Sequence, residues 1–453
     1  MTEQFPTPVI GMEIHVELKT KSKMFCGCKN DPFGADAPNT HTCPVCLGLP
    51  GALPVPNRKA VEWTIRLALA LNCSISMESK FDRKHYSYPD LPKGYQISQY
   101  DQPIGHDGYL EIGEGEKRSK IRIRRVHLEE DTGKLSHKEI DGENVSLIDF
   151  NRSSVPLVEI VTEPDMRSAE EAKEFGKKLH RIVRYSDVSD ADMEKGSMRL
   201  EANVSVSEHT EITEDNLPPY KVELKNINSF RFMALAADYE IKRQREARAR
   251  GEKIPQETRG WDEAKKATRL QRVKEDAQEY RYFPDPDLPP MRFKEEMVAS
   301  IKKSLPPMPD TYAAQFVAAG ASYESADILT DDMATAQLVA EALPLVSDGK
   351  IFINWFLRNR DTNAALSAAD LAKRFADEKG SKVTDEAVII EWVKTVVDEN
   401  QNVVAEFKAG KESVLMFLVG KVQKLAAGKA DAQVVMRLLR SQIDQYTRSS
   451  VAR

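Results

Sequence analysis

One short stretch, Gly11–Leu18, constrains the fold most, because its polar and apolar residues alternate strictly. It reads Gly-Met-Glu-Ile-His-Val-Glu-Leu. Successive side chains of a strand point to opposite faces, so Glu13, His15 and Glu17 share one face and the apolar residues share the other. The pattern predicts a strand with one buried face. The polar face is either the wet side of an edge strand or a set of carboxylates and an imidazole that holds a divalent cation.

Two later segments supply carboxylates that fit the second interpretation. Residues 127–131, His-Leu-Glu-Glu-Asp, crowd like charges at the end of a predicted strand, and such charges repel one another unless a cation neutralises them. Glu159 interrupts the apolar strand Pro156–Val161, where it is either an outward-facing residue or a ligand. The candidate metal ligands are Glu13, His15, Glu130 and Glu159. Glu17 has no such support and is interpreted as an ordinary surface residue of the strand.

Four of the five cysteines form two close pairs, Cys26-x-Cys28 and Cys43-x-x-Cys46. Two thiolate pairs at this spacing predict a tetrahedral, structural zinc site, and four thiolates leave no open position for catalysis. Disulfide or redox use is the alternative, but the chain has no recognisable export signal. The residues between the pairs are rich in Asn, Asp, Pro and Gly and could not pack a core without such a staple.

Residues 80–105 form a loop-rich stretch that is dense in basic, aromatic and amide groups. Lys84 and Lys93 could bind phosphates there, while Tyr86 and Tyr95 supply contact surface. An ordinary surface loop would collect similar residues, so both interpretations stay open.

Charge and hydropathy narrow the class of protein. The net charge is −6, but residues 408–453 contain nine Lys or Arg against Glu412, Asp431 and Asp444. This basic tail suits an anionic partner, although solvated helix faces give similar counts. No apolar run approaches the roughly 18 residues that a membrane span needs, and residues 1–8 lack the features of a signal peptide. We therefore expect a cytoplasmic protein that does not contact membrane.

No familiar phosphate-binding or hydrolase motif is present. The chain lacks a Walker-type loop, a Rossmann fingerprint and a Gly-x-Ser-x-Gly elbow. The acidic residues and His15, together with Lys84 and Lys93, are instead typical of metal-assisted phosphoryl transfer, in which a hard cation bridges phosphate oxygens and ammonium groups offset developing charge.

Long motifs along the first 290 residues closely resemble the B subunits of bacterial Asp/Glu-tRNA amidotransferases. The matching stretches are Val9–Leu18, Ser79–Lys84, Tyr88–Gln99, His127–Lys134, Asp149–Arg152, Val158–Asp165, Glu223–Phe230, Gln256–Arg259 and Tyr280–Pro290.

The resemblance implies an α+β fold, in which an antiparallel-sheet-rich catalytic cradle precedes all-α domains. The expected domains are the cradle at 1–292, with the cysteine loop near 26–46, a helical domain at 293–383, and a tRNA-contacting helical tail at 384–453. The Pro-rich segment Tyr280–Pro290 and the change to helical periodicity after it mark the first boundary. The bundle of short helices beyond it suggests a working surface, not a pocket.

The resemblance also implies the reaction and the partners. The family activates the side-chain carboxylate of mischarged Asp-tRNA(Asn) or Glu-tRNA(Gln) with ATP and amidates it with ammonia. The ammonia comes from the amidase, or A, subunit, and the small C subunit joins the two larger ones in a heterotrimer. Magnesium is held by residues matching Glu13, His15, Glu130 and Glu159, and Lys84, Tyr86 and Lys93 lie in the segment used around the substrate. The rival hypotheses are a zinc-stabilised tRNA-binding protein without catalysis and a stand-alone metal-dependent hydrolase.

Four features depart from the family pattern. Glu201 stands where family members commonly have Asp. The cysteine quartet is present in only some members, and the segment near 361–383 is shorter than usual. The match in the tail, Phe417–Lys421, is brief.

Overall fold

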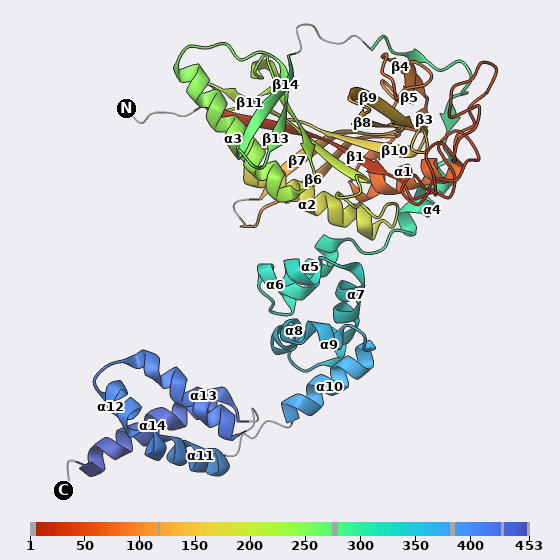
Figure 1. Cartoon of the computed structure of the whole chain (residues 1–453). Coiled ribbons are helices and arrows are strands. Elements are labelled where there is room, and N and C mark those ends of the chain that lie inside the picture. Colours follow the sequence, from red (N-terminus) through yellow and green to blue (C-terminus); the bar gives the residue numbers. More distant parts are fainter. Residues whose placement is uncertain (1–5, 116–117, 274–279, 381–385, 427–429, 451–453) are drawn as a thin grey trace. The chain divides into compact units, whose positions relative to one another are not determined.

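The alternating stretch forms β1 (Thr7–Glu17), which is the central strand of a nine-stranded sheet (Figure 1). It pairs antiparallel with a neighbour on each side, so the edge-strand interpretation is wrong. All pairs in the sheet are antiparallel except β12 with β13. In spatial order the strands are β14 (Ala267–Val273), β13 (Glu257–Asp262), β12 (Val222–Ile227), β11 (Met198–Ser207), β1, β10 (Pro156–Thr162), β7 (Ser119–Glu130), β6 (Gly105–Ile112) and β2 (Ser74–Ile75).

The computed structural model describes residues 6–115, 118–273, 280–380, 386–426 and 430–450. The chain divides into two units, one ending at Pro309 and the other beginning at Asp310. The first unit contains the sheet and the second is helical, which confirms the predicted α+β class.

One face of the large sheet is apolar and covered by three helices, α1 (Arg58–Ala70), α2 (Ala169–Tyr185) and α3 (Phe230–Ala249). Met12, Ile14 and Val16 of β1 lie in this core, each at most 1% exposed. The helices begin at Asn57, Ser168 and Ser229, whose side chains accept backbone N–H groups of the first turn. Because this face is filled, the ionisable residues of β1 and β10, together with His127 and Glu129 of β7, lie on the opposite face.

Short strands close one end of the polar face. β4 (Asp82–His85) and β5 (Tyr95–Ser98) pair with each other, and β4 also pairs with β15 (Phe283–Pro284), so the stretch predicted as loop-rich contains two strands. β3 (Glu78–Ser79) pairs with β16 (Met291–Arg292). The sequence patterns did not predict the hairpin of β8 (Lys134–Ile140) and β9 (Glu143–Asp149), although Asp141 and Gly142 between them have the positive φ angles of a tight hairpin turn, 53° and 82°.

The first unit extends beyond the expected end at residue 292, because α4 (Glu295–Lys303) packs against the sheet domain. Met297, Ile301 and Leu305 are partly buried against its core. The sheet unit therefore includes the first helix of the predicted helical domain, and ends at Pro309.

The second unit consists of helices joined by short connections. Residues Ile389 to Ile443 contribute one apolar cluster, formed by the last four α-helices. The expected boundary at 383/384 lies outside the described residues. Across the described ranges, no helix is long and apolar enough to cross a membrane. The helices are α5 (Pro309–Ala318), α6 (Tyr323–Leu329), α7 (Met333–Ala342), α8 (Gly349–Arg358), α9 (Arg360–Asn363), α10 (Ala368–Gly380), α11 (Glu386–Glu399), α12 (Gln401–Lys408), α13 (Leu415–Leu425) and α14 (Ala432–Ser450).

Candidate active site

The uncovered face of the large sheet carries rows of ionisable side chains from five adjacent strands. Directly opposed residues of antiparallel strands point to the same face, and β1 pairs His15 with Glu159 on one side and with Arg199 on the other. Glu159 is in turn opposite His127 of β7. The strand register therefore assembles charged groups that are far apart in the sequence.

His15, Glu129 and Glu159 form the first acidic group, in which ligand atoms from each residue lie within 4.8 Å of one another. His15 Nε2 is 3.8 Å from Glu129 Oε1 and 3.7 Å from Glu159 Oε2. Burial alone would lower the pKa of His15, but its hydrogen bond to Glu159 and the charges of Glu159 and Glu129 raise it to about 9. Burial opposes ionisation of Glu159 as well, yet the charge of His127 holds its pKa well below the usual range.

Lys84 adds a cation beside this group. Burial would lower its pKa, but the nearby charges of Glu129 and Glu159 raise it above the ordinary lysine value. The Nζ atom also lies 5.0 Å from the ring centroid of Tyr280. The carboxylates of Glu129 and Glu159 thus lie near the ammonium of Lys84, a combination that phosphoryl transfer requires.

Glu130 lies apart from the first group, because adjacent residues of β7 point to opposite sides. Its Oε1 is 2.5 Å from Lys93 Nζ and accepts a hydrogen bond from the backbone N–H of Ile97. Gln96 links this corner to Tyr86, accepting from the Tyr86 hydroxyl at 3.2 Å and donating to the backbone carbonyl of Glu130 at 2.7 Å.

Glu13 belongs to a second acidic group with Glu201 and Glu223, again with ligand atoms within 4.8 Å of one another. Asn203 donates to Glu13 at 2.8 Å, and Lys225 Nζ lies 3.0 Å from Glu201. Burial would lower the pKa of Lys225, but the carboxylates of Glu201 and Glu223 raise it.

A pocket of about 360 Å³ adjoins this second group. Its walls include Glu13 and Asn203 on the sheet, three cations (Arg124, Arg125 and Lys221), and the apolar or aromatic residues Leu217, Pro218 and Tyr220. Arg125 Nε and Asn203 Oδ1 are buried and have no hydrogen-bond partner among the residues that the structure describes. Such orphaned groups indicate a place built for a polar ligand.

Glu17 is buried, 6% exposed, so its interpretation as an ordinary surface residue is wrong. It contacts Asp131, whose Oδ2 lies 2.5 Å from Arg199 Nη2. Burial and the negative charge of Asp131 raise the pKa of Glu17 to about 8, against the opposing effect of Arg199. The two carboxyl groups therefore share one proton near neutral pH.

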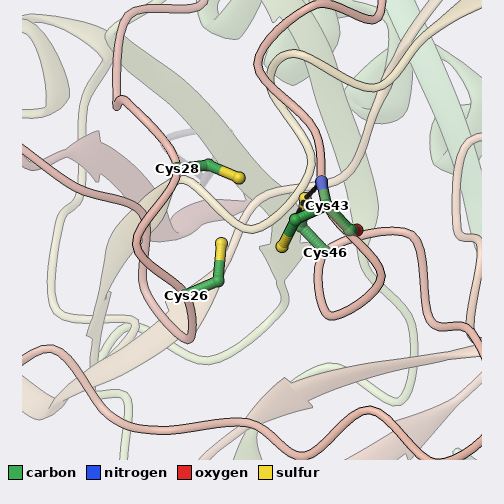
Figure 2. A group of neighbouring side chains, drawn as sticks. All are labelled: Cys26, Cys28, Cys43 and Cys46. Carbon is green, nitrogen blue, oxygen red and sulfur yellow. Dashed lines mark hydrogen bonds between the residues drawn. The ribbon is translucent and has the colours of Figure 1, made fainter.

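The four cysteines meet in the loop between β1 and α1, and Figure 2 shows their sulfur atoms turned toward a shared space. Their Sγ atoms lie within 4.8 Å of one another, and those of Cys43 and Cys46 are 3.9 Å apart. Four thiolates at the usual zinc–sulfur distance of about 2.3 Å are roughly 3.8 Å apart, whereas a disulfide needs about 2 Å. All four thiols are free, and the arrangement fits a single metal ion.

Family comparisons match almost the whole chain. The GatB/GatE catalytic domain model matches residues 8–299 and the GatB domain model matches residues 324–443. Proteins named as the B subunits of aspartyl/glutamyl-tRNA(Asn/Gln) amidotransferases are similar along nearly their full length. The one from Brevibacillus brevis is 43% identical over 95% of this chain and 97% of its own. The one from Thermotoga maritima is 43% identical over 96% and 99%, and that from Thermodesulfovibrio yellowstonii is 44% identical over 95% and 98%.

The chain belongs to the amidotransferase B-subunit family. The family predicted from the motifs is thus confirmed. The predicted enzyme class is confirmed with it, since tRNA-dependent amidotransferases are carbon–nitrogen ligases.

For this B-subunit family member, the structure brings together only part of the predicted ligand set. His15 and Glu159 meet, whereas Glu13 lies in the second group and Glu130 in neither. Among the substrate residues, Lys84 lies near the charges of the first group and Lys93 pairs with Glu130. Tyr86 is linked to the Glu130 backbone through Gln96.

The sequence patterns missed Glu129, which completes the first group, and left out Glu201 and Glu223, which complete the second. Strand parity could have found Glu129, since it shares a face with His127. Glu223 begins a family motif and alternates with Val222 and Leu224, so the sequence indicates its polar face but not its partners.

Proposed function

We propose that this protein is the carboxylate-activating subunit of a tRNA-dependent amidotransferase, acting on mischarged Asp-tRNA(Asn) or Glu-tRNA(Gln). The similar proteins carry aspartyl- and glutamyl-tRNA in their names. The observation that carries the proposal is the meeting of His15, Glu129 and Glu159 with the Lys84 cation on one sheet face.

Carboxylate activation explains why such a face is useful. A carboxylate is a poor acyl donor, because its leaving group would be oxide, and transfer of a phosphoryl group from ATP makes phosphate the leaving group. Both reactants are anionic, so Lys84 would offset their repulsion and stabilise charge on the transferring group. Ammonia from a partner would then displace phosphate, and a closed path would keep water from the acyl phosphate.

Magnesium is the cofactor that the first acidic group fits best. His15, Glu129 and Glu159 would hold it, with Glu13 and Glu201 beside them on the same face. When bound, magnesium would neutralise phosphate charge. Imidazole is an unusual ligand for a hard ion, so manganese should substitute in vitro.

The 360 Å³ pocket beside Glu13 is the proposed site of the ATP nucleoside. Leu217, Pro218 and Tyr220 offer an apolar wall for a base, and the unpartnered Arg125 Nε offers a hydrogen bond to an anionic or polar group. Its position next to the acidic face would direct the phosphates toward the proposed metal.

Zinc is the proposed occupant of the cysteine group, in a structural role. Four thiolates around one tetrahedral ion leave no open position, and the spacing of Cys26, Cys28, Cys43 and Cys46 fits such an ion. Free thiols also suit a reducing cytoplasm, where we place the protein.

The proposed partners are an amidase, the A subunit, that supplies ammonia, a small C subunit, and tRNA bound in part by the helical tail. The similar proteins are named as the B subunit of their enzyme, and this name supports an assembly of several subunits, which we propose to be a heterotrimer.

A matched pair of substitutions tests the metal assignment. Glu129→Gln and Glu130→Gln change adjacent, equally buried carboxylates that point to opposite sides of β7. In the reconstituted complex, Glu129→Gln should lower tRNA-dependent ATP hydrolysis by about 100-fold or more, the scale of losing a group that stabilises phosphoryl charge. Glu130→Gln should cost less, because its partner is Lys93. Unchanged turnover of the folded Glu129→Gln variant would contradict the proposal, and inactivity of wild type would favour a tRNA-binding protein without catalysis.

A further inference from the structure

A fully buried lysine lies against the cysteine group. Among the described lysines, Lys23 is the one whose relative exposure falls to 0%, and its backbone N–H donates to the carbonyl of Cys28 at 3.0 Å. The residue is therefore fixed at the start of the Cys26–Cys28 turn. A buried ammonium is costly unless a negative charge and hydrogen-bond acceptors compensate it.

The surroundings of Lys23 offer no carboxylate for that purpose. Within the described part of the chain, its Nζ donates to Cys46 Sγ at 3.8 Å and to the backbone carbonyl of Phe150 at 3.1 Å, and no acidic side chain forms an ion pair with it. The charge that compensates Lys23 must then come from the cysteines.

Cys46 is also the cysteine that most needs such a partner. Its residue exposure is 0%, whereas Cys26, Cys28 and Cys43 are half-buried and open to water. Its Sγ also accepts the backbone N–H of Cys43 at 3.1 Å. Four thiolates on one divalent ion leave a net charge of −2, and water cannot solvate the part of that charge on Cys46.

We propose that Lys23 is the charge partner of the four-cysteine zinc centre, that its ammonium donates to the Cys46 thiolate, and that it thereby raises the affinity of the centre for zinc. The inference rests on the zinc assignment proposed above. Lys23 does not ligate the ion; it acts through a ligand, as outer-shell hydrogen-bond donors do at other metal sites.

The test compares Lys23→Met with Lys21→Met in the full-length chain. Both substitutions remove one ammonium and keep a similar stem, but Lys21 is exposed. Zinc content is measured by elemental analysis and zinc affinity by competition with a chromogenic chelator. We expect one zinc per chain in wild type and in Lys21→Met, and a dissociation constant about 10- to 100-fold higher in Lys23→Met, the usual cost of losing an outer-shell partner. Affinities of the two variants within about twofold of each other would overturn the proposal, whereas absence of zinc from wild type would overturn the zinc assignment itself.

Cobalt supplies a readout that reports on the thiolate directly. Loss of a donor to a coordinated thiolate makes its electrons easier to transfer, so the sulfur-to-cobalt charge-transfer band of Lys23→Met should move to lower energy than that of Lys21→Met. An identical band position would contradict the contact.

If Lys23→Met does not fold at ordinary zinc levels, refolding at increasing zinc concentration decides the question. The proposal expects recovery at a higher zinc concentration than wild type needs, and failure of any zinc concentration to restore the fold overturns it.

Discussion

At the scale of single residues, the polar face of the sheet is governed by buried charges whose pKa values move in opposite directions. Glu17 and Asp131 illustrate this: burial and the charge of Asp131 raise the pKa of Glu17 to about 8, while Arg199 and Arg152 hold that of Asp131 far below normal despite burial. The pair stores one proton in the folded state. Neither pKa is predictable from the residue type.

This proton gives a pH dependence of stability. The folded pKa of Glu17, about 8, exceeds its ordinary value of 4.5, so the folded state binds the proton more tightly. Its contribution to stability is complete below pH 4.5 and is lost as the pH rises toward 8. Because of this proton, the free energy of unfolding of wild type should be lower at pH 8 than at pH 5. The Glu17→Gln variant should lack this contribution to the difference. If the variant keeps the full wild-type dependence of the free energy of unfolding on pH, the proposal that Glu17 and Asp131 share a proton is contradicted.

His15 predicts a pH dependence of metal binding. Its pKa is about 9 in the metal-free site, because Glu159 and Glu129 outweigh the effect of burial, and only the neutral imidazole can ligate. The apparent affinity for Mn²⁺ should therefore rise about tenfold per pH unit between pH 6.5 and 8, as one proton is released. Titration followed by electron paramagnetic resonance would measure it.

The control for this titration is His106→Ala, which removes a half-buried histidine paired with Asp107. It should keep the wild-type pH slope. A slope near zero in wild type would rule out His15 as a ligand.

At the scale of elements, the cysteine loop holds the segment that leads into β10. Ser153 Oγ donates to the carbonyl of Cys46, the N–H of His41 donates to Asn151, and the N–H of Met24 donates to the carbonyl of Ser154. The segment in turn places Arg152 3.7 Å from Asp131. The cysteine loop therefore supports one end of the acidic face, although the proposed zinc ion would have no catalytic position of its own.

Removal of the proposed zinc ion should loosen this segment. Chelation should increase hydrogen exchange at the amides of residues 150–155 at least tenfold, because contacts that fix them come from the cysteine loop. The strands β11 and β12, which lie on the other side of β1, serve as the internal control and should keep their protection. Equal exchange before and after chelation would show that the loop keeps its structure without metal.

At the scale of the whole molecule, the packing of the last four α-helices decides where a deletion that tests the basic tail should begin. Lys408, where the basic run begins, is the last residue of α12. Val393 and Val397 of α11 are buried in one cluster with residues of α13 and α14. A cut at Lys408 would expose that cluster. Some tail cations are also paired, Arg437 with Glu386 and Arg440 with Glu412.

Deletion of residues 386–453 removes all four helices of this apolar cluster. No part of the cluster is then left exposed to solvent. In the reconstituted complex it should raise the KM for mischarged tRNA about tenfold or more while kcat changes little, because the deletion removes binding contacts but no reacting group. An unchanged KM would exclude the tail as a tRNA-binding element. A deletion from Lys408 serves as the comparison and should lose stability as well.

The sequence determined the fold class, the presence of a strand with two different faces at residues 11–18, the clustering of four cysteines and the family. These follow from local signals: a period of two, close Cys spacings, helix caps and long motifs. It also placed His15 and Glu159 correctly on the polar face, because parity within one strand is a property of the chain itself.

Only the tertiary structure decided which carboxylates meet. Strand register put Glu129 beside His15 and Glu159 and sent Glu130 to Lys93, and it joined Glu13 to Glu201 and Glu223. The tertiary structure also shows that β1 is the central strand of the sheet and not an edge strand. Glu17 is therefore a buried, protonated residue and not a surface residue. Strand register and burial depend on partners that are distant in the sequence, so no pattern within a single strand could have fixed which side chains meet.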